Sequence, residues 1–112
     1  LAIVTGRPRR DAQRFLSAEG LDGLFAHVIC SEDAARKPDP APVRRALAAL
    51  AVERAWMLGD TVDDVRAARA AGVVSLGVVA PGDDAALTGP ALIAAGAARV
   101  LTSPSELLSL LS

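Results

Sequence analysis

Short, continuously apolar runs alternate along the sequence with segments whose apolar residues recur at helical spacing. Runs without polar alternation are typical of strands that are buried on both faces of a parallel sheet. The expected strands are Leu1–Thr5, Ala26–Cys30, Ala55–Asp60, Val73–Val79 and Ala98–Leu101. Strands that alternate with helices predict an α/β fold with a parallel sheet, and no other feature of the sequence narrows the architecture as much.

The segments between these runs carry the usual start and stop signals of helices. Pro40 stands in the first turn of one expected helix with Asp39 as its cap, while Gly20 and Gly72 end two others. The expected helices cover Pro8–Glu19, a segment from Asp39 to Leu50, Thr61–Ala71, Asp83–Ala95 and Ser103–Leu111. No repeat or linker interrupts them, and 112 residues suit one ordinary domain, so we expect residues 1–112 to form a single domain.

Charge and cysteine content argue against several classes of partner. Twelve basic and 13 acidic residues give a net charge of −1, so no excess of positive charge favours nucleic acid or an anionic membrane surface. The apolar runs are also too short to span a membrane. The single cysteine, Cys30, cannot form an internal disulfide, which fits the reducing cytoplasm that we expect for this protein. Nothing in the sequence indicates an oligomeric state.

Polar residues follow three of the expected strands at the point where each strand ends. These segments are Thr5–Arg7, Ser31–Lys37 and Gly59–Thr61. In open parallel sheets, ligands bind outside the carboxyl ends of the strands. We therefore expect a hydroxyl, an ammonium group and a cluster of carboxylates to converge at one edge of the sheet.

These groups suit phosphoryl transfer, which needs mainly positioning and neutralisation of charge. Asp60 offers a hard oxygen ligand for Mg²⁺, and Asp63 and Asp64 lie within reach of the same edge. The Thr5 hydroxyl can donate to a phosphoryl oxygen, and Lys37 can place a positive charge on the same group. A nucleophilic aspartate, which covalent phosphoryl transfer often uses, has no candidate on a strand before Thr5.

Structural interpretations of the same residues remain open. Thr61 and Asp64 have the spacing of a helix capping box, in which Asp64 needs no catalytic role. Arg7, Arg9 and Arg10 crowd a helix start, where the helix dipole disfavours cations. They either bind an anionic substrate or are screened by solvent and a neighbouring aspartate.

Three stretches resemble the motifs of a known enzyme family. "LAIVTGRP", "RKPDPAP" and "MLGDTVDDVRAARAAG" are similar, in this order, to the second, third and fourth motifs of the haloacid dehalogenase-like (HAD) hydrolase superfamily. Phosphoglycolate-phosphatase-like members with a helical cap are the most similar subgroup. The resemblance implies a Rossmann-like, three-layer αβα fold. It also implies a Mg²⁺-dependent phosphatase that acts on a small phosphorylated metabolite through an aspartyl-phosphate intermediate.

The resemblance assigns a role to each matching residue. It implies that Thr5, Lys37 and Asp60 are catalytic, and that Thr5, Gly6, Arg7 and Lys37 bind the substrate phosphoryl group. It implies that Asp60 ligates Mg²⁺ and that Asp64 is the further acidic residue of the metal site, acting through a water or through Lys37. Asp63 has the weakest case of the three carboxylates.

The sequence departs from the family pattern at its beginning. The first motif, an Asp-x-Asp segment on the central strand, is absent, and so is the helical cap that normally follows it. In the family that strand lies between the strand ending at Thr5 and the strand ending at Asp60. We therefore expect two facing strand edges with unpaired backbone groups. We also expect residues 1–112 to be a fragment that is inactive and poorly stable alone.

Two other functional classes compete with this interpretation. A signalling receiver domain also gathers acidic residues, threonine and lysine around Mg²⁺, but it places the acidic cluster early and the lysine last. The order here is Thr5, Lys37, Asp60. A non-catalytic binding or scaffold protein that has lost its first motif is the other alternative, although retention of all three residues argues mildly against it.

Overall fold

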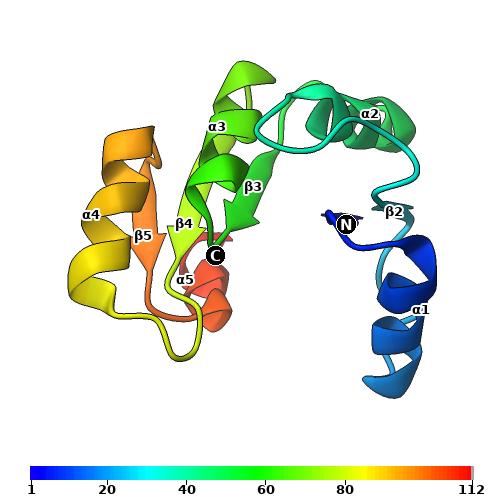
Figure 1. Ribbon diagram of the computed structural model, residues 1–112, viewed down its shortest axis with the longest axis horizontal. Coiled ribbons are helices and arrows are strands. Elements are labelled where there is room, and N and C mark those ends of the chain that lie inside the picture. Colours follow the sequence, from blue (N-terminus) through cyan, green and yellow to red (C-terminus); the bar gives the residue numbers. More distant parts are fainter. Residues whose placement is uncertain (112) are drawn as a thin grey trace.

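The computed structural model describes residues 1–111, whose strands form two parallel sheets (Figure 1). Strand β1 (Ala2–Val4) pairs with β2 (His27–Ile29) in one sheet. Strand β4 (Val74–Val78) lies between β3 (Trp56–Gly59) and β5 (Arg99–Leu101) in the other. Every pair is parallel, so the predicted α/β fold with parallel strands is confirmed, with strands slightly shorter than expected.

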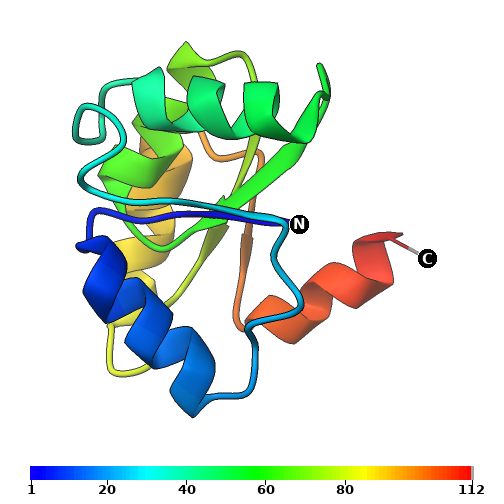
Figure 2. The ribbon, with the colours of Figure 1, turned by 90° about the vertical axis from the view of Figure 1, so that its right-hand side faces the viewer.

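The helices occupy the segments between strands, as predicted. They are α1 (Arg9–Ala18), α2 (Ala41–Leu50), α3 (Val62–Ala70), α4 (Ala85–Ala95) and α5 (Leu107–Leu111), the last preceded by a 3₁₀ turn at Pro104–Glu106. Helix α2 begins one residue later than expected, yet Asp39 still accepts a hydrogen bond from the Ala41 amide at 2.8 Å. Figure 2 shows α5 standing apart from helices α1 to α4. No helix in this part of the chain has the length and apolar character that a membrane crossing needs.

Helix α3 is central to the packing because it contacts α2, α4 and strands β3 and β4. One side of it, through Ala67 and Ala68, forms a buried cluster with Val43 of α2. Its other side, through Val65, packs against Leu92 of α4. Small residues let these elements approach closely, which compensates for the scarcity of aromatic residues in the core.

Helix α2 joins the two sheets. It packs against β1 and β2 on one side and against α3 on the other, and Figure 1 shows it at the top of the view between α3 and β2. Because no strand ladder links β1 to β3 in the described residues, α2 provides much of the packing that holds the halves together.

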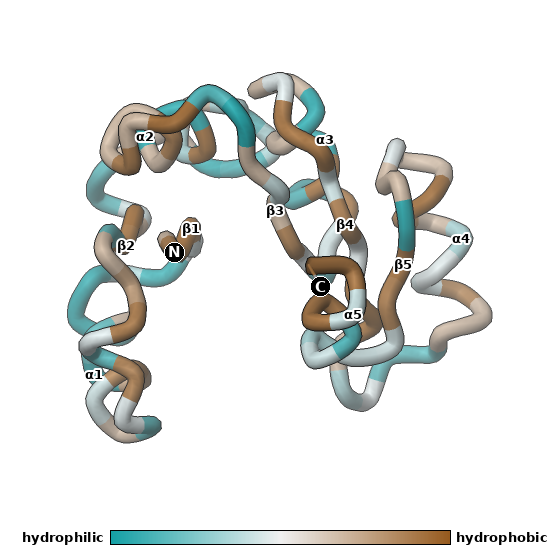
Figure 3. The backbone as a smooth tube through the Cα atoms, turned by 180° about the vertical axis from the view of Figure 1, so that it is seen from behind, coloured by the Kyte–Doolittle hydropathy of each residue, from teal (hydrophilic) through white to brown (hydrophobic). Residues whose placement is uncertain are grey.

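A cavity of about 580 Å³ lies beneath α2, between β1 and β3. Its wall includes Ala2–Val4 of β1, Trp56–Leu58 of β3 and apolar side chains of α2. Figure 3 shows hydrophobic residues on the two strands that flank it. We call this space the interstrand cavity. It lies where the sequence led us to expect two facing strand edges, and neither edge has a strand partner there within residues 1–111.

Packing of α4 on the second sheet can be tested by truncating Leu92, which is 1% exposed. A Cβ atom at Gly77 would lie only 2.9 Å from the Leu92 Cδ1 atom, so α4 rests closely on β4. We expect Leu92→Ala to lower the free energy of unfolding by about 2–5 kcal/mol, because it leaves a cavity in the core. Leu87→Ala, on the same helix but 72% exposed, should change it by less than about 0.5 kcal/mol. Urea denaturation would measure both, and equal losses would contradict this description of the core.

Candidate functional site

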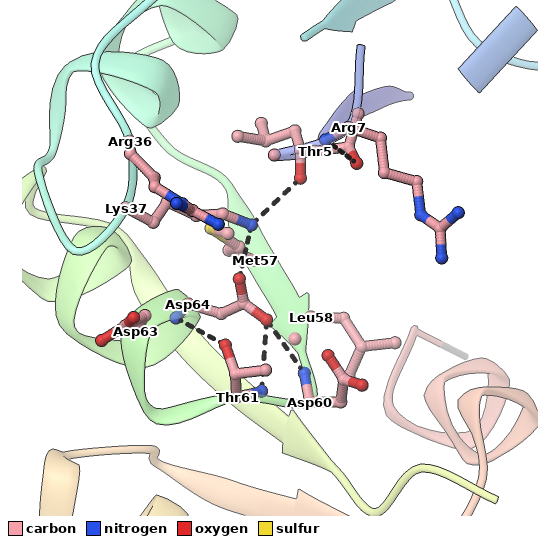
Figure 4. A pocket seen from close by; sticks show the side chains of 13 residues that line it. Thr5, Arg7, Arg36, Lys37, Met57, Leu58, Asp60, Thr61, Asp63 and Asp64 are labelled. Atoms are coloured by element: carbon pink, nitrogen blue, oxygen red, sulfur yellow. Dashed lines mark hydrogen bonds and ion pairs between the residues drawn. The ribbon is translucent and has the colours of Figure 1, made fainter. Parts of the chain in front are cut away.

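The carboxyl ends of β1 and β3 open into a pocket of about 530 Å³ (Figure 4). Three segments line it: the end of β1 with the turn that follows, the loop before α2, and the end of β3 with the first turn of α3. The predicted site residues among its walls are Thr5, Gly6, Arg7, Lys37, Asp60 and Asp64, and Asp63, which had the weakest case, lines it as well. The convergence expected from the positions of these residues after the strands is therefore present in the structure.

Asp64 is held in place by the start of α3. Its backbone N–H donates to the Thr61 hydroxyl at 3.1 Å, and its Oδ2 atom accepts from the Thr61 amide at 3.2 Å. These reciprocal bonds form the capping box that the sequence suggested. The Asp60 amide donates to the same Oδ2 atom at 3.2 Å, so this carboxylate also fixes the backbone at the end of β3.

The remaining Asp64 oxygen, Oδ1, accepts a hydrogen bond from the Lys37 Nζ atom at 2.5 Å. Lys37 also donates to the Val4 carbonyl at 3.2 Å. One ammonium group thus connects the end of β1 with the start of α3 across the pocket. Lysine has three N–H donors, so one stays available to a ligand.

Gly59 makes room for this arrangement. A Cβ atom at Gly59 would lie 2.5 Å from the Asp64 Cβ atom and 2.7 Å from Oδ2. Any larger residue would push Asp64 away from its partners. The glycine before Asp60 therefore serves packing rather than an unusual backbone conformation.

Burial and pairing act in opposite directions on Asp64, whose side chain is 10% exposed. Burial raises the pKa of its carboxyl group, whereas the hydrogen bond and charge of Lys37 and the bonds from Thr61 lower it. The net effect is a lowered pKa, so Asp64 is ionised at neutral pH. Lys37 is also largely covered, with its side chain 16% exposed.

Asp60 is exposed at the rim of the pocket, and its carboxylate accepts no hydrogen bond from the rest of residues 1–111. It differs in this respect from Asp64, both of whose oxygens are engaged. No group of three or more potential metal ligands gathers anywhere in this part of the chain. The exposed Asp60 carboxylate fits Mg²⁺, because this ion takes one or two protein carboxylates and completes its shell with water and substrate oxygens.

The turn after β1 presents the Thr5 hydroxyl. Its Oγ1 atom accepts from the Arg7 amide at 3.1 Å, which leaves the hydroxyl proton free for donation. The Ser31 amide donates to the Arg7 carbonyl at 3.0 Å and ties this turn to the loop after β2. No described atom accepts a bond from the Gly6 amide, so it is a second donor at the same place.

A polar contact that sequence reasoning missed anchors the start of α1. The Arg9 guanidinium pairs with Asp33 and donates to the Val28 carbonyl at 3.3 Å, while the Arg9 amide donates to Glu32 at 2.9 Å. The Arg9 amide is the main cause of the lowered pKa of Glu32. Arg9 therefore serves the loop after β2, and of the three arginines near this helix start only Arg7 lines the pocket. Glu32 and Asp33 lie shortly after β2, but nothing in the sequence pairs them with Arg9.

The Lys37–Asp64 pair predicts a pH dependence of stability. Because folding lowers the pKa of Asp64, its ionised form stabilises the protein above the ordinary aspartate pKa of about 3.9, and this contribution is lost as the pH falls through the folded value. We expect Asp64→Asn to lower the free energy of unfolding at pH 7 by about 1–3 kcal/mol, and the difference from the parent protein to shrink below about pH 4.

Asp63→Asn is the matched control, since Asp63 is exposed and precedes Asp64 in the same helical turn. It should change the free energy of unfolding by less than about 0.5 kcal/mol. Urea denaturation between pH 3 and 7 would measure both variants. Parallel pH profiles for Asp64→Asn and Asp63→Asn would contradict the stabilising role of the ion pair.

Comparison with known proteins gives consistent results. A sequence model of the haloacid dehalogenase-like hydrolases matches residues 1–78. A phosphoglycolate phosphatase of Cupriavidus necator is 40% identical over 100 residues, covering 83% of this chain and 43% of that protein. An imidazoleglycerol-phosphate dehydratase of Phytophthora nicotianae is 51% identical over 83 residues, covering 72% of this chain and 18% of that protein.

Solved structures show the same fold. The crystal structure of a HAD family hydrolase from Deinococcus radiodurans with bound phosphate and sodium has a TM-score of 0.81 at 32% identity. The match covers 98% of this chain and 49% of that chain. The chain thus spans about half of this solved chain and less than half of the curated relatives. The family match and the α/β structure together show that the chain belongs to the haloacid dehalogenase-like hydrolases.

Proposed function

We propose that residues 1–112 form the phosphoryl-binding and metal-binding part of a phosphatase that hydrolyses a small phosphate monoester. The observation that carries this proposal is the single pocket at which Thr5, Lys37 and Asp60 meet from three separate segments. Relatives named phosphoglycolate phosphatase support the same class of reaction.

The donors of the pocket would hold the phosphoryl group. The Thr5 hydroxyl and the Gly6 amide would donate to its oxygens from the end of β1. The third N–H of Lys37 would reach it from the opposite wall, because the other two are fixed by Asp64 and Val4. Such preorganised donors stabilise the charge that spreads over the phosphoryl oxygens in the transition state.

Asp60 is the residue that would hold Mg²⁺ directly, since its carboxylate is exposed to the pocket and unengaged. When bound, this ion would neutralise phosphoryl charge and orient the substrate. Asp64 would support the site indirectly by holding the Lys37 ammonium group in position. Direct ligation by Asp64 would compete with the hydrogen bonds that both of its oxygens already accept.

The interstrand cavity suggests where the nucleophile comes from. An extended segment paired with both β1 and β3 would fill the cavity and satisfy the two facing edges. Such a strand, running parallel to its neighbours, would end beside Thr5 and Asp60. We infer that a strand from outside residues 1–112 places an aspartate there. This aspartate would attack phosphorus, release the alcohol and form an aspartyl phosphate that water then hydrolyses.

Substitution of Asp60 tests the metal-binding role. We expect Asp60→Asn in the phosphatase to reduce kcat for p-nitrophenyl phosphate by about 100-fold or more, because loss of the carboxylate weakens Mg²⁺ binding. The apparent affinity for Mg²⁺ should fall as well. Asp63→Asn is the matched control and should keep activity within about twofold, because the proposal gives Asp63 no role in binding Mg²⁺ or the phosphoryl group. Full activity of Asp60→Asn at low Mg²⁺ would refute the assignment.

Trp56 offers a probe of the proposed strand, because it is the single tryptophan and it lines the interstrand cavity. We expect the 112-residue chain alone to unfold in a broad urea transition and to lack phosphatase activity. The version extended by the coding sequence upstream of Leu1 should unfold cooperatively, with Trp56 emission shifted to the blue by burial. Cooperative unfolding together with Mg²⁺-dependent activity of the 112-residue chain would refute the proposed strand.

A further inference from the structure

The donors of the pocket lie on two segments that extend beyond the pairing of β1 with β2. Thr5 and Gly6 belong to the turn after β1, and Lys37 belongs to the loop after β2 (Figure 4). The ladder between the two strands ends with the bond from the Thr5 amide to the Ile29 carbonyl at 2.9 Å. Beyond this bond, other contacts must fix the turn and the loop relative to each other.

Arg9, the first residue of α1, binds the loop after β2 through both its side chain and its backbone. The guanidinium pairs with Asp33 and donates to the Val28 carbonyl at 3.3 Å. The Arg9 amide donates to the two carboxylate oxygens of Glu32 at 2.9 Å and 3.1 Å. We call Arg9, Glu32 and Asp33 the loop clamp.

The start of α1 depends on the loop clamp, because α1 has no side-chain cap of its own. Pro8 stands at the cap position and accepts no bond through its side chain. Glu32 accepts the Arg9 amide instead, from 23 positions further along the chain. The helix dipole also favours a carboxylate at this end of a helix. The first turn of α1 is therefore fixed by the loop after β2 rather than by its own sequence.

Asp33 holds the loop on the other side of the clamp. Its Oδ2 atom accepts from the Cys30 amide at 2.7 Å as well as from Arg9. Its backbone carbonyl accepts from the Arg45 guanidinium of α2. The Asp33 side chain is only 18% exposed, so water competes little for its carboxylate. Asp33 thereby joins the end of β2, the start of α1 and α2, within the same loop that carries Lys37.

We propose that Arg9 and Asp33 are positioning residues, which hold the donors of the pocket in place around the phosphoryl group. This inference rests on the proposed phosphatase function. Neither residue lines the pocket, so both act through the turn after β1 and through the loop that carries Lys37. Preorganised donors stabilise a transition state only where they meet the developing charge, and a misplacement of about 1 Å can cost about 100-fold in rate.

Inhibition by orthovanadate tests this role, because vanadate adopts the five-coordinate geometry of phosphoryl transfer and reports how well the donors fit the transition state. Inhibition of p-nitrophenyl phosphate hydrolysis by the phosphatase in Mg²⁺ gives the vanadate Ki. Neither Ki nor KM depends on the fraction of enzyme that is folded. We expect Arg9→Gln to raise Ki about tenfold or more, to lower kcat by a similar factor and to change KM by less than about threefold.

Two further variants separate positioning from a general effect of charge. Both side-chain bonds of Arg9 come from its Nη2 atom, so the ammonium group of Arg9→Lys can replace them. The vanadate Ki of Arg9→Lys should therefore stay within about threefold of the parent value. Arg10→Gln removes the neighbouring exposed charge, which lies outside the pocket, and should leave Ki and KM within about twofold.

Asp33→Asn gives a second route to the same contact, since it keeps an acceptor for the Cys30 amide but loses the charge that binds Arg9. It should raise Ki about as much as Arg9→Gln, and the double variant should exceed either by less than about twofold, because both changes remove one interaction. Multiplied effects in the double variant, or an unchanged Ki in either single variant, would overturn the proposal and leave the phosphatase function intact. A parent phosphatase that neither hydrolyses p-nitrophenyl phosphate nor binds vanadate would refute the phosphatase proposal and this inference with it.

Discussion

The ion pair between Lys37 and Asp64 is the contact on which the candidate site depends. It joins the loop that leaves the first sheet to the helix that follows β3, and the bond from Lys37 to the Val4 carbonyl brings in β1 as well. No strand pairing connects these parts within residues 1–111. A buried pair of this kind needs good geometry to offset its desolvation, and the Asp60 and Thr61 amides supply it by fixing the carboxylate.

The packing around this pair relies on small side chains. Ala67 and Ala68 let α2 approach α3, and Gly59 lets the Asp64 side chain lie against the end of β3. Close approach of backbones places the pocket at the junction of both sheets. The interstrand cavity has a different cause, because it lies between the edges of β1 and β3, which have no strand between them within residues 1–111.

Local signals in the sequence predicted the elements and most of the site. Apolar runs located the strands, and the spacing of Thr61 and Asp64 predicted the capping box that the structure contains. Contacts between distant segments were not predictable in this way. The pairing of Arg9 with Asp33 joins residues 24 positions apart, and nothing in the local pattern of either segment distinguishes it from solvent exposure. The local sequence likewise gives no sign that Arg36 lies on the pocket wall.

Asp64 has two structural roles, and this determines how natural substitutions at this position would affect the protein. One carboxylate both starts α3 and fixes the lysine of the pocket, so a substitution there would weaken folding and the site together. Partly unfolded protein is removed by cellular proteases, and a loss of about 1–2 kcal/mol can lower abundance several-fold. The first effect of a damaging substitution at Asp64 in cells would therefore be a lower amount of the protein. The Asp60 side chain accepts no hydrogen bond from residues 1–111, so a variant there would leave a normal amount of an impaired protein.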